Sequence, residues 1–349
     1  MTTNSNFLTR NRGILIFLAV MLIAPFLVGL MEGSSPATIL NNAGSFSRFL
    51  EGLAIEIFIW AIFALSFDLL FGITGLLSFG HAMFFAVAAY LTGIALKTLQ
   101  LPFWQVVLLV LLAAVLQALL FSLVLPRVKG ITFTLVSLGF ASVFHIIVMS
   151  SDMINLTGAD VGLQGVPVPA FLNPTNERFR FYVIALVLLV ATYIFYRRFV
   201  ASPTGRVCVA IRENEGRAKM LGYNTTTFKI IAMIISSITA SIAGMLHALY
   251  QPIISPSVAD LGFTVTALLI VLIGGVGSLN GAIVGAFALR LVDFVLRRFV
   301  GGSASIITGA IYVVFVLFVP YGIIGTLRLR KLNTKAGWKE VLARITGKP

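Results

Sequence analysis

The stretch LAIEIFIWAIFALSFDLLFGITGLLSFGHAMFFAVAAYLTG, residues 53–93, decides the fold of this chain. It holds most of two apolar runs, 52–71 and 76–97, which are separated by the glycine-rich break FGITGLLSFG. About 20 consecutive apolar residues are enough for a helix to cross the hydrocarbon core of a bilayer. The stretch therefore predicts two membrane-spanning helices that meet at a break.

The composition of the whole chain extends this prediction. Of its 349 residues, 59% are hydrophobic and 11% are charged, and the mean hydropathy is +1.03. A soluble domain is about 45–50% apolar and about 25% charged. Because this chain has too little polar surface to cover itself, we expect the bilayer to be its solvent and the fold to be an all-α polytopic membrane protein.

Similar apolar runs recur along the chain and predict about ten transmembrane helices. We place them at 13–30, 52–71, 76–97, 103–125, 131–150, 181–199, 229–250, 261–279, 281–299 and 304–324. The first run is longer than the apolar region of a typical signal peptide, and no small-residue cleavage site follows it closely, so we interpret it as a span. We expect residues 1–325 to form one transmembrane domain and 326–349 a basic cytoplasmic tail.

The distribution of lysine and arginine predicts the orientation. Basic residues collect in short cytoplasmic loops of membrane proteins. With ten crossings both termini are cytoplasmic, and most basic residues fall on that side: Arg10, Arg12, Arg127, Lys129, Arg197, Arg198, Arg206, Arg212, Arg217, Lys219, Lys229 and those of the tail. Arg297 and Arg298 are an exception, so the region after Gly274 is either re-entrant or counted wrongly.

The formal net charge of +13 fits the same bias. The basic residues lie between apolar runs without the interleaved aromatic side chains of a nucleic-acid surface. We therefore expect membrane lipid, and no nucleic acid, as a partner.

Two polar segments stand out from the apolar sequence. One is a loop at about 151–180, rich in glycine and proline, which the topology places outside. The other is an inner helix at about 202–222, with Ser202 as its N-cap, Pro203 at its first position and Gly222 as a left-handed stop. We expect it to be a single helix of about four turns.

The charges of this inner helix favour docking into a partner protein. Two pairs, Glu213–Arg217 and Glu215–Lys219, have the favourable i,i+4 order. An apolar face is expected from Val207, Ile211, Ala218 and Leu221. Basic residues alone would suit lipid headgroups, whereas alternating signs suit the register and specificity of a protein interface.

No cofactor site is expected in this chain. The segment GGVGSLNG, 274–281, lacks the Lys and Ser/Thr that end a phosphate-binding loop. Cys208 is the one cysteine, and the three histidines are far apart, so no metal or catalytic set is predicted.

Ionisable residues inside the apolar runs are candidates for a role in transport. They are Glu56, Asp68, His81, His145, His247, Arg290 and Asp293. For each, a substrate or proton role and a role as an interior hydrogen-bond partner both stay open. Asp68 and His81 flank the first break and are expected to line a polar pocket together. A faint repeat links FGITGLL, 71–77, with IGGVGSL, 273–279, and points to both breaks as parts of a pathway.

Five motifs in order resemble a known family. They are FDLLFGITGLLSFGHAMFFAVAAYLTG, GITFTLVSLGFASV, LTGADVGLQGV, SPTGRVCVAIRENEGRAKMLGYNTTTFK and LLIVLIGGVGSLNGAIVGA. From about residue 50 to 325 the chain resembles the permease subunits of branched-chain amino-acid ABC importers, specifically the longer of the two paired permeases.

The resemblance implies a type II importer-like fold of about ten helices in the bacterial cytoplasmic (inner) membrane. It implies a heterodimer with a shorter permease, two cytoplasmic ATPase subunits that bind ATP and Mg²⁺, and a periplasmic or lipid-anchored solute-binding protein. The implied substrate is a branched-chain or hydrophobic amino acid, and urea or short amides are the alternative. If the resemblance is set aside, the alternative function is that of a stand-alone ion-coupled secondary transporter.

The resemblance also assigns roles to segments. Helix 202–222 is similar to the coupling helix that meets the ATPase, although Glu215-Gly216-Arg217 replaces the Glu-Ala-Ala of importers and Gly222 falls one residue late. The ATPase-docking candidates are Ile211, Arg212, Glu213, Glu215, Arg217, Lys219, Leu221 and Gly222. The pathway or gate candidates are Asp68, Gly72, Gly75, Ser78, Gly80, His81, Gly274, Gly275 and Gly277. The binding-protein contact candidates are Thr157, Gly158, Asp160 and Gly162.

Overall fold

The computed structural model describes residues 12–31, 45–124, 128, 130–175, 177–301, 304–319 and 321–327. The predictions for Arg10, Arg127, Lys129 and the tail from residue 328 lie outside these residues. Within them, six helices are long and apolar enough to cross a membrane. They are α4 (Ser45–Asp68) with the π-helical turn η1 (Leu69–Ile73), α6 (Phe103–Ser122), α7 (Ile131–Met149), α9 (Arg178–Ala201), α11 (Thr225–Tyr250) and α13 (Leu279–Val300).

Four further apolar helices occupy the remaining predicted runs. They are α2 (Arg12–Met31, with Phe17–Leu30 as its apolar part), α5 (His81–Lys97), α12 (Leu261–Gly274) and α14 (Ala304–Phe318). The prediction of an all-α membrane protein is confirmed, and every predicted run coincides with an apolar helix. At 1.5 Å per residue, α12 is about 21 Å long, which is shorter than the roughly 30 Å hydrocarbon core.

The boundaries at the two breaks differ from the prediction. The run expected to begin at residue 76 becomes helical only at His81, and the run expected to end at residue 279 ends at Gly274. The reason is backbone conformation: Gly75 has φ +80° and Gly277 has φ +71°, and neither value fits a right-handed helix. Each break therefore contains a true turn.

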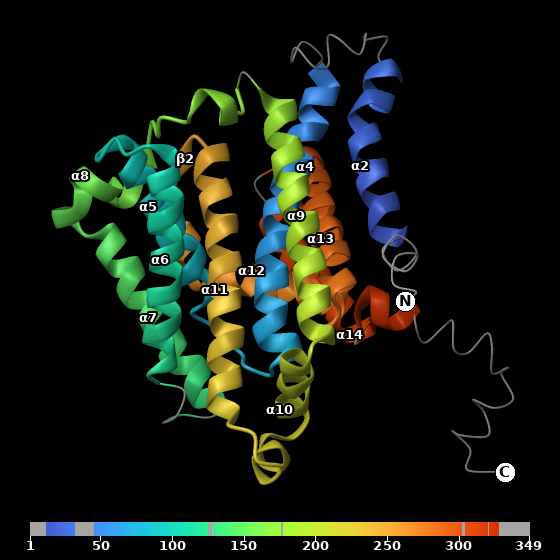
Figure 1. The fold of residues 1–349 in the computed structure, drawn as a ribbon. Coiled ribbons are helices and arrows are strands. Elements are labelled where there is room, and N and C mark those ends of the chain that lie inside the picture. The colour runs from blue at the N-terminus through green and yellow to red at the C-terminus, as the bar shows by residue number, and fades with distance from the viewer. Residues whose placement is uncertain are drawn as a thin grey trace, which may run out of the picture.

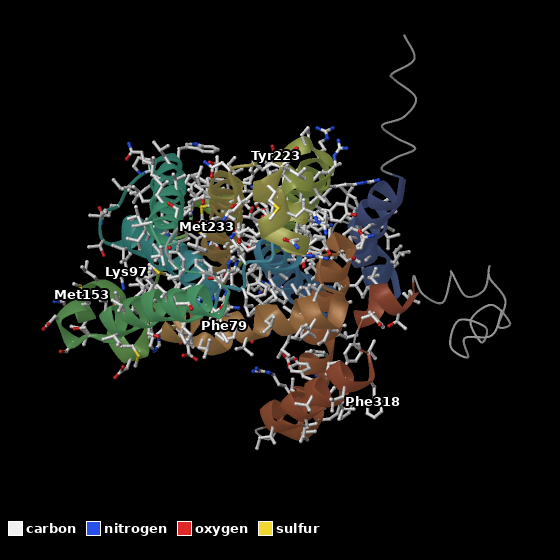
Figure 2. All side chains as sticks on the ribbon, turned by 90° about the horizontal axis from the view of Figure 1, so that it is seen from below. Phe79, Lys97, Met153, Tyr223, Met233 and Phe318 are labelled. Atoms are coloured by element: carbon white, nitrogen blue, oxygen red, sulfur yellow. The ribbon has the colours of Figure 1, made fainter. Side chains whose placement is uncertain are left out.

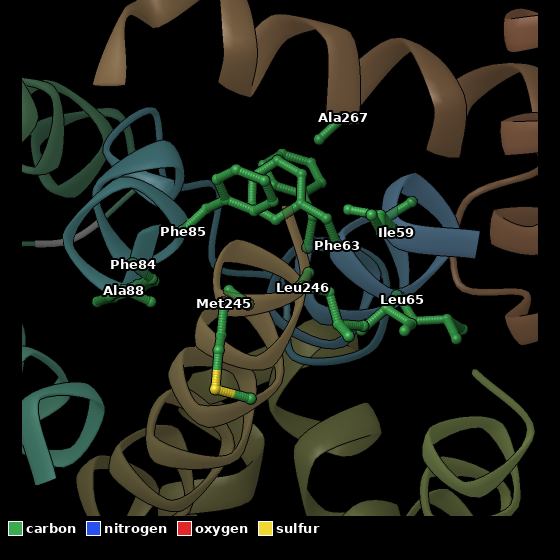
Figure 3. Packing of buried hydrophobic residues seen from close by; sticks show 14 of the residues in the cluster. Ile59, Phe63, Leu65, Phe84, Phe85, Ala88, Met245, Leu246 and Ala267 are labelled. Carbon is green, nitrogen blue, oxygen red and sulfur yellow. The ribbon is translucent and has the colours of Figure 1, made fainter. Parts of the chain in front are cut away.

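Helix α11 forms the centre of the bundle and packs against α4, α5 and α6 (Figure 1). Small residues make this packing close, since a Cβ placed on Gly244 would lie 2.1 Å from the carbonyl oxygen of Phe85. Beside it, the rings of Phe63 and Phe85 lie 5.0 Å apart, between Leu246 of α11 and Ala267 of α12 (Figure 3). The core is thus a set of interlocked helices around α11.

The two polar segments lie at opposite ends of the bundle, as the topology predicts (Figure 1). Helix α10 (Pro203–Met220) lies at one end (Figure 1). The other end carries a two-stranded antiparallel pair, in which Leu163 of β1 (Leu163–Gln164) pairs with Ile254 of β2 (Ile253–Ile254). Short helices surround this pair: η2 (Ser151–Met153), α8 (Ile154–Thr157), η3 (Ala159–Val161), η4 (Ala170–Leu172) and η5 (Pro256–Ala259).

Helix α13 begins near α10 and runs without a break to Val300. Its 22 residues give a length of about 33 Å. Arg297 and Arg298 therefore lie at the end remote from α10, and α14 projects from one side of the bundle, where Figure 2 labels Phe318.

We predict that Gly244→Ala lowers the stability of the bundle. The added methyl group meets the α5 backbone, and such overpacking costs about 1–3 kcal/mol. Gly139→Ala on α7 is the matched control, because no atom lies within 4 Å of a Cβ placed there. The apparent Tm of the purified protein in detergent should fall for Gly244→Ala and not for Gly139→Ala; equal Tm values for the two variants would contradict this packing.

Candidate functional site

The two glycine-rich breaks, which lie about 200 residues apart in the sequence, are in direct contact. A Cβ placed on Gly72 would lie 2.4 Å from the backbone nitrogen of Gly277, and one placed on Gly277 would lie 2.7 Å from the carbonyl oxygen of Gly72. The absence of side chains is what permits this approach. Gly75 and Gly277, which are equivalent in the faint sequence repeat, also share the left-handed conformation.

Asp68 fastens this contact. Its Oδ1 accepts a hydrogen bond of 2.8 Å from the backbone N–H of Gly277. The side chain is fully buried, and its Oδ2 has no hydrogen-bond partner among the described residues. A buried carboxylate bonded to a backbone N–H ties the end of α4 to the turn between α12 and α13.

Arg212 connects the same contact to α10. Its guanidinium donates a hydrogen bond to the carbonyl oxygen of Gly72, and its Cγ would lie 2.9 Å from a Cβ placed on Gly75. The structure thus brings together a residue expected to dock the ATPase and glycines expected to form a gate. We call Asp68, Gly72, Gly75, Arg212 and Gly277 the junction.

Helix α10 is not a single helix, and this corrects the prediction. Asn214 has φ −162° and ψ 99°, so the helix is broken there. The Oδ1 of Asn214 accepts a hydrogen bond of 2.9 Å from the N–H of Arg217, which makes it the N-cap of a second short segment. Because the break lies between them, Glu213 and Arg217 do not form the predicted pair, and Glu213 instead pairs with Arg212 at 2.9 Å.

The predicted ends of α10 and its second charge pair are confirmed. The Oγ of Ser202 accepts from the N–H of Gly205 at 3.2 Å. At the other end Gly222 has φ +87°, and its N–H donates to the carbonyl of Lys219 at 2.9 Å. Glu215 and Lys219 form an ion pair of 3.1 Å.

Glu215 also ties α10 to α11. Its carboxylate accepts from the Nζ of Lys229 at 2.8 Å and from the Oγ1 of Thr225 at 3.0 Å. Partial burial alone would raise the pKa of Glu215, but the hydrogen bonds from Lys229, Lys219 and Thr225 prevail and lower it to about 2. Glu215 therefore links α10 to α11 within the chain, and we call this set of bonds the tether.

The exposed part of α10 differs from the predicted apolar face. Val207, Ile211 and Ala218 are buried and pack with Phe228, so Ile211 cannot dock a partner here. Leu221 was expected on the same face, yet it is 71% exposed, and its neighbour Met220 is 89% exposed. The break at Asn214 turns the second segment relative to the first. In Figure 2, which looks from the α10 end, Tyr223 lies on the surface beside this tip.

The segment between Leu77 and Gly80, at the end of the first break, is held by α7. The Oγ1 of Thr134 donates to the carbonyl oxygen of Leu77 at 2.8 Å, and the N–H of Gly80 donates to the Oγ of Ser137 at 3.3 Å. A Cβ on Gly80 would lie 2.0 Å from the carbonyl oxygen of Ser137. Ser78 is buried here, and its Oγ has no partner among the described residues.

His81 does not join Asp68 in a shared polar pocket. Its Nε2 lies 2.8 Å from the Oγ of Ser66, and its ring packs against Phe63, Phe67 and Phe84. Asp68 has its own partner in Gly277. The prediction of a joint pocket is wrong because phenylalanines enclose the imidazole.

The second break borders a cavity. Gly274 packs against Gly281, since a Cβ on Gly274 would lie 1.8 Å from the Gly281 carbonyl oxygen, and Gly275 has φ +119°. Beside this turn lies a cavity of 860 Å³, lined by Gly277, Ser278 and Asn280, by Tyr193 and Arg197 of α9, and by apolar side chains of α2, α9 and α13. The hydroxyl of Tyr193 on α9 donates to the Oδ1 of Asn280.

Charged residues of α4 and α13, with a tyrosine of α14, form a cluster inside the bundle. Arg290 pairs with Glu56 at 2.5 Å and lies 3.7 Å from Asp293, and its guanidinium stands 5.4 Å from the ring centre of Trp60. Tyr312 donates to Asp293 at 3.3 Å. The sequence predicts each of these ionisable residues as a separate candidate. Of their contacts, the i,i+3 spacing indicates the one between Arg290 and Asp293, whereas Glu56 lies 234 residues from Arg290 and its pairing could not be predicted.

Three of the four binding-protein candidates support the outer loop. Thr157 donates to the carbonyl oxygens of Val148 and Met153, and glycine is required at 158 and 162, where a Cβ would lie 2.1 Å and 2.5 Å from backbone oxygens. Asp160 is exposed. Of the four candidates, Asp160 is therefore the one whose side chain is available at the surface.

These features define a multi-pass α-helical membrane protein whose broken helices meet at a polar junction. The chain belongs to the family described as "Branched-chain amino acid transport system / permease component", whose model matches residues 49–320. The resemblance found in the sequence motifs is confirmed. The family consists of permease components, so the chain is a transport subunit and not an enzyme.

Curated relatives agree with this assignment. The chain is 27% identical over 315 residues to the high-affinity branched-chain amino acid transport system permease protein LivM of Salmonella typhimurium, which covers 83% of this chain and 73% of LivM. It is 26% identical to LivM of Escherichia coli K12, covering 81% and 71%. It is 22% identical to LivH of Salmonella typhimurium, covering 78% and 93%. No solved structure matches the chain.

The comparison also separates the two permease types. An alignment of 294 residues covers 93% of LivH, whereas 315 residues cover 73% of LivM, so LivM is the longer protein. The higher identity to LivM confirms the predicted resemblance to the longer permease.

We predict that Glu215→Gln loosens the tether between α10 and α11. Losing hydrogen bonds to a charged acceptor that is 28% exposed should cost about 1 kcal/mol, and hydrogen exchange of residues 215–230 should speed up roughly fivefold. Glu213→Gln is the control, because that side chain is 66% exposed. Equal exchange in both variants would contradict the tether.

The pH dependence of this effect follows from the lowered pKa. A carboxyl whose pKa falls on folding stabilises the fold above its ordinary value of 4.5 and loses that contribution as the pH drops towards about 2. The ratio of the exchange rate of Glu215→Gln to that of the unsubstituted protein should therefore be roughly equal at pH 8 and pH 5. The ratio should shrink only below about pH 4.

Proposed function

We propose that this chain is the transmembrane permease of an ATP-driven ABC importer and forms the translocation pathway for branched-chain or other hydrophobic amino acids. The proposal includes ten crossings in a type II importer-like fold, with both termini in the cytoplasm of a bacterial inner membrane. The family membership and the similarity to LivM support the substrate class.

The observation that carries the mechanism is the junction. Arg212 lies on α10, at the end of the bundle assigned to the cytoplasm, and bonds the first break directly. Asp68 bonds the second break. A displacement of α10 therefore reaches both breaks through two hydrogen bonds. A coupling mechanism requires an element with different contacts in two states, and we assign this role to the junction.

The docking surface follows from exposure on α10. Met220 and Leu221 are the large apolar side chains at the tip, and Glu213, Arg217 and Lys219 surround them with both charge signs. An apolar centre with a charged rim is the usual composition of a protein interface. We assign this tip to the ATPase subunit, whose bound ATP and Mg²⁺ supply the energy.

The remaining partners are a second, shorter permease, a second ATPase and a solute-binding protein. Asp160, at the exposed outer end, is the contact we assign to the binding protein. The cavity beside Gly277 is lined by apolar side chains and a few polar groups, which suits a small amphipathic solute. We assign it to the pathway.

The function is tested by reconstituting the chain with these partners in proteoliposomes. Uptake of labelled leucine should require ATP and the binding protein, and an ion gradient should not replace ATP. Uptake driven by a gradient with this chain alone would show a secondary carrier. Uptake of urea or a short amide instead of leucine would reassign the substrate.

We predict that Leu221→Asp weakens association with the ATPase. A charge placed at an apolar interface centre loses affinity, by about 2 kcal/mol or roughly 30-fold. Val161→Asp at the outer end is the control, because Val161 is 67% exposed on the other side. The recovery of ATPase with the affinity-purified permease measures the effect, and unchanged recovery for Leu221→Asp would exclude this tip.

We predict that Arg212→Ala separates ATP hydrolysis from uptake. It removes a hydrogen bond to the first break, worth about 1.5–3 kcal/mol for a charged donor, so leucine taken up per ATP hydrolysed should fall roughly tenfold or more. Arg206→Ala, which changes an exposed arginine of the same helix that lies outside the docking tip, should retain the ratio. Equal ratios for the two variants would remove the junction from the mechanism.

A further inference from the structure

A second cavity opens at the end of the bundle remote from α10. It measures 940 Å³ and lies between the outer loop, the first turns of α4 and α9 and the segment after α11. We call it the outer recess. Its lining includes Glu56, Val166, Val168, Arg178, Leu249 and Gln251. It therefore combines one acidic and one basic side chain with an apolar wall.

The arginine of the outer recess is held in place by backbone atoms. The Nε of Arg178 donates to the carbonyl oxygen of Pro174 at 3.4 Å, and its Nη1 donates to that of Arg48 at 3.1 Å. No carboxylate in the described part of the chain forms an ion pair with it, although the buried Glu51 attracts it at longer range. A guanidinium has five N–H donors in a fork that suits a carboxylate.

The acid of the outer recess belongs to a charged cluster. Glu56 pairs with Arg290 and accepts from the amide of Gln251 at 3.2 Å. Arg290 also lies 3.7 Å from Asp293, so two carboxylates share this guanidinium. Tyr312, His247 and the second arginine, Arg297, face the same cluster on its inner side. Among the residues that line the recess, Glu56 is the acidic group that can face a cation there.

The two charges of the outer recess are separated by about one helical turn. A Cβ placed on Gly52 would lie 3.6 Å from the Nη1 of Arg178 and 2.9 Å from the hydroxyl of Tyr250. Glu56 follows Gly52 by four residues on the same face of α4, about 6 Å further along. Glycine at position 52 makes room for the Tyr250 hydroxyl, which donates to the Gly52 carbonyl oxygen at 3.1 Å and adds a polar group to the recess wall between the two charges.

We propose that the outer recess binds the zwitterion of an α-amino acid. The ligand carboxylate bonds Arg178, its ammonium group lies at Glu56, and its apolar side chain packs against Val166, Val168 and Leu249. Opposite charges one turn apart match a zwitterion better than a simple anion or cation. The choice of an aliphatic amino acid rests on the proposed function, and the site receives the ligand before it reaches the cavity beside Gly277.

The test uses a cysteine placed in the outer recess. Val166→Cys is made in the full chain, reconstituted with its partner subunits, and labelled with a membrane-impermeant maleimide from outside. The chain's one native cysteine, Cys208, is buried. At ten times its Kd, L-leucine should slow labelling about tenfold, because mass action leaves about a tenth of the sites free. Leucinamide lacks the carboxylate and isocaproate lacks the ammonium group, so neither should slow it at the same concentration.

Two variants control the measurement. Val161→Cys lies outside the outer recess and is 67% exposed, so leucine should not alter its labelling. Arg178→Gln added to Val166→Cys should abolish protection, and Arg178→Lys should restore part of it. Protection by leucinamide or isocaproate equal to that by leucine would overturn the zwitterion site.

The same vesicles distinguish this inference from the proposed function. If ATP drives leucine uptake while leucine gives Val166→Cys no protection, the outer recess is not a substrate site and the proposed function stands. If uptake and protection are both absent, both are overturned. If protection occurs without ATP-driven uptake, the site is supported and the importer function is rejected.

Discussion

The close approach of two glycine-rich breaks is the constraint on which the rest of the structure depends. Gly72 and Gly277 come together only because neither has a side chain, and Asp68 and Arg212 then bond the exposed backbone groups of the breaks. An interrupted helix leaves backbone donors and acceptors without partners, which is costly inside a membrane protein. The Asp68 carboxylate provides a partner for the Gly277 N–H and the Arg212 guanidinium one for the Gly72 carbonyl, so each break depends on side chains from other parts of the bundle.

The central helix α11 and the junction differ in how firmly they are held in the bundle. Helix α11 is fixed at its centre by close contact with α5, and at its base by Lys229, which bonds Glu215. By contrast, the junction is held by two hydrogen bonds, each between a side chain and a backbone group. Motion applied to α10 is therefore expected to be taken up at the breaks before it disturbs the central packing.

Much of this architecture was predictable from the sequence, and the limits have physical causes. Runs of apolar residues located all ten apolar helices, because hydrophobic length is a local property. The caps at Ser202 and Gly222 and the pair Glu215–Lys219 were also local, and they were found. The break at Asn214 has a local cap to Arg217, but capping propensity alone does not separate a break from a polar residue within a helix. The enclosure of His81 by phenylalanines depends in part on neighbours from the preceding helix. The partners of Asp68 and Glu56 could not be found because they lie far away in the sequence.

The pairing of Glu56 with Arg290 has a consequence for the synthesis and membrane insertion of the protein. The acid is synthesised 234 residues before its partner, which at about 5–20 residues per second is a delay of roughly 10–50 s. During that interval α4 has an unpaired carboxyl group that is costly in lipid. The early helices must therefore wait beside water or the insertion machinery until α13 arrives, so the last third of the chain completes the membrane integration of the first.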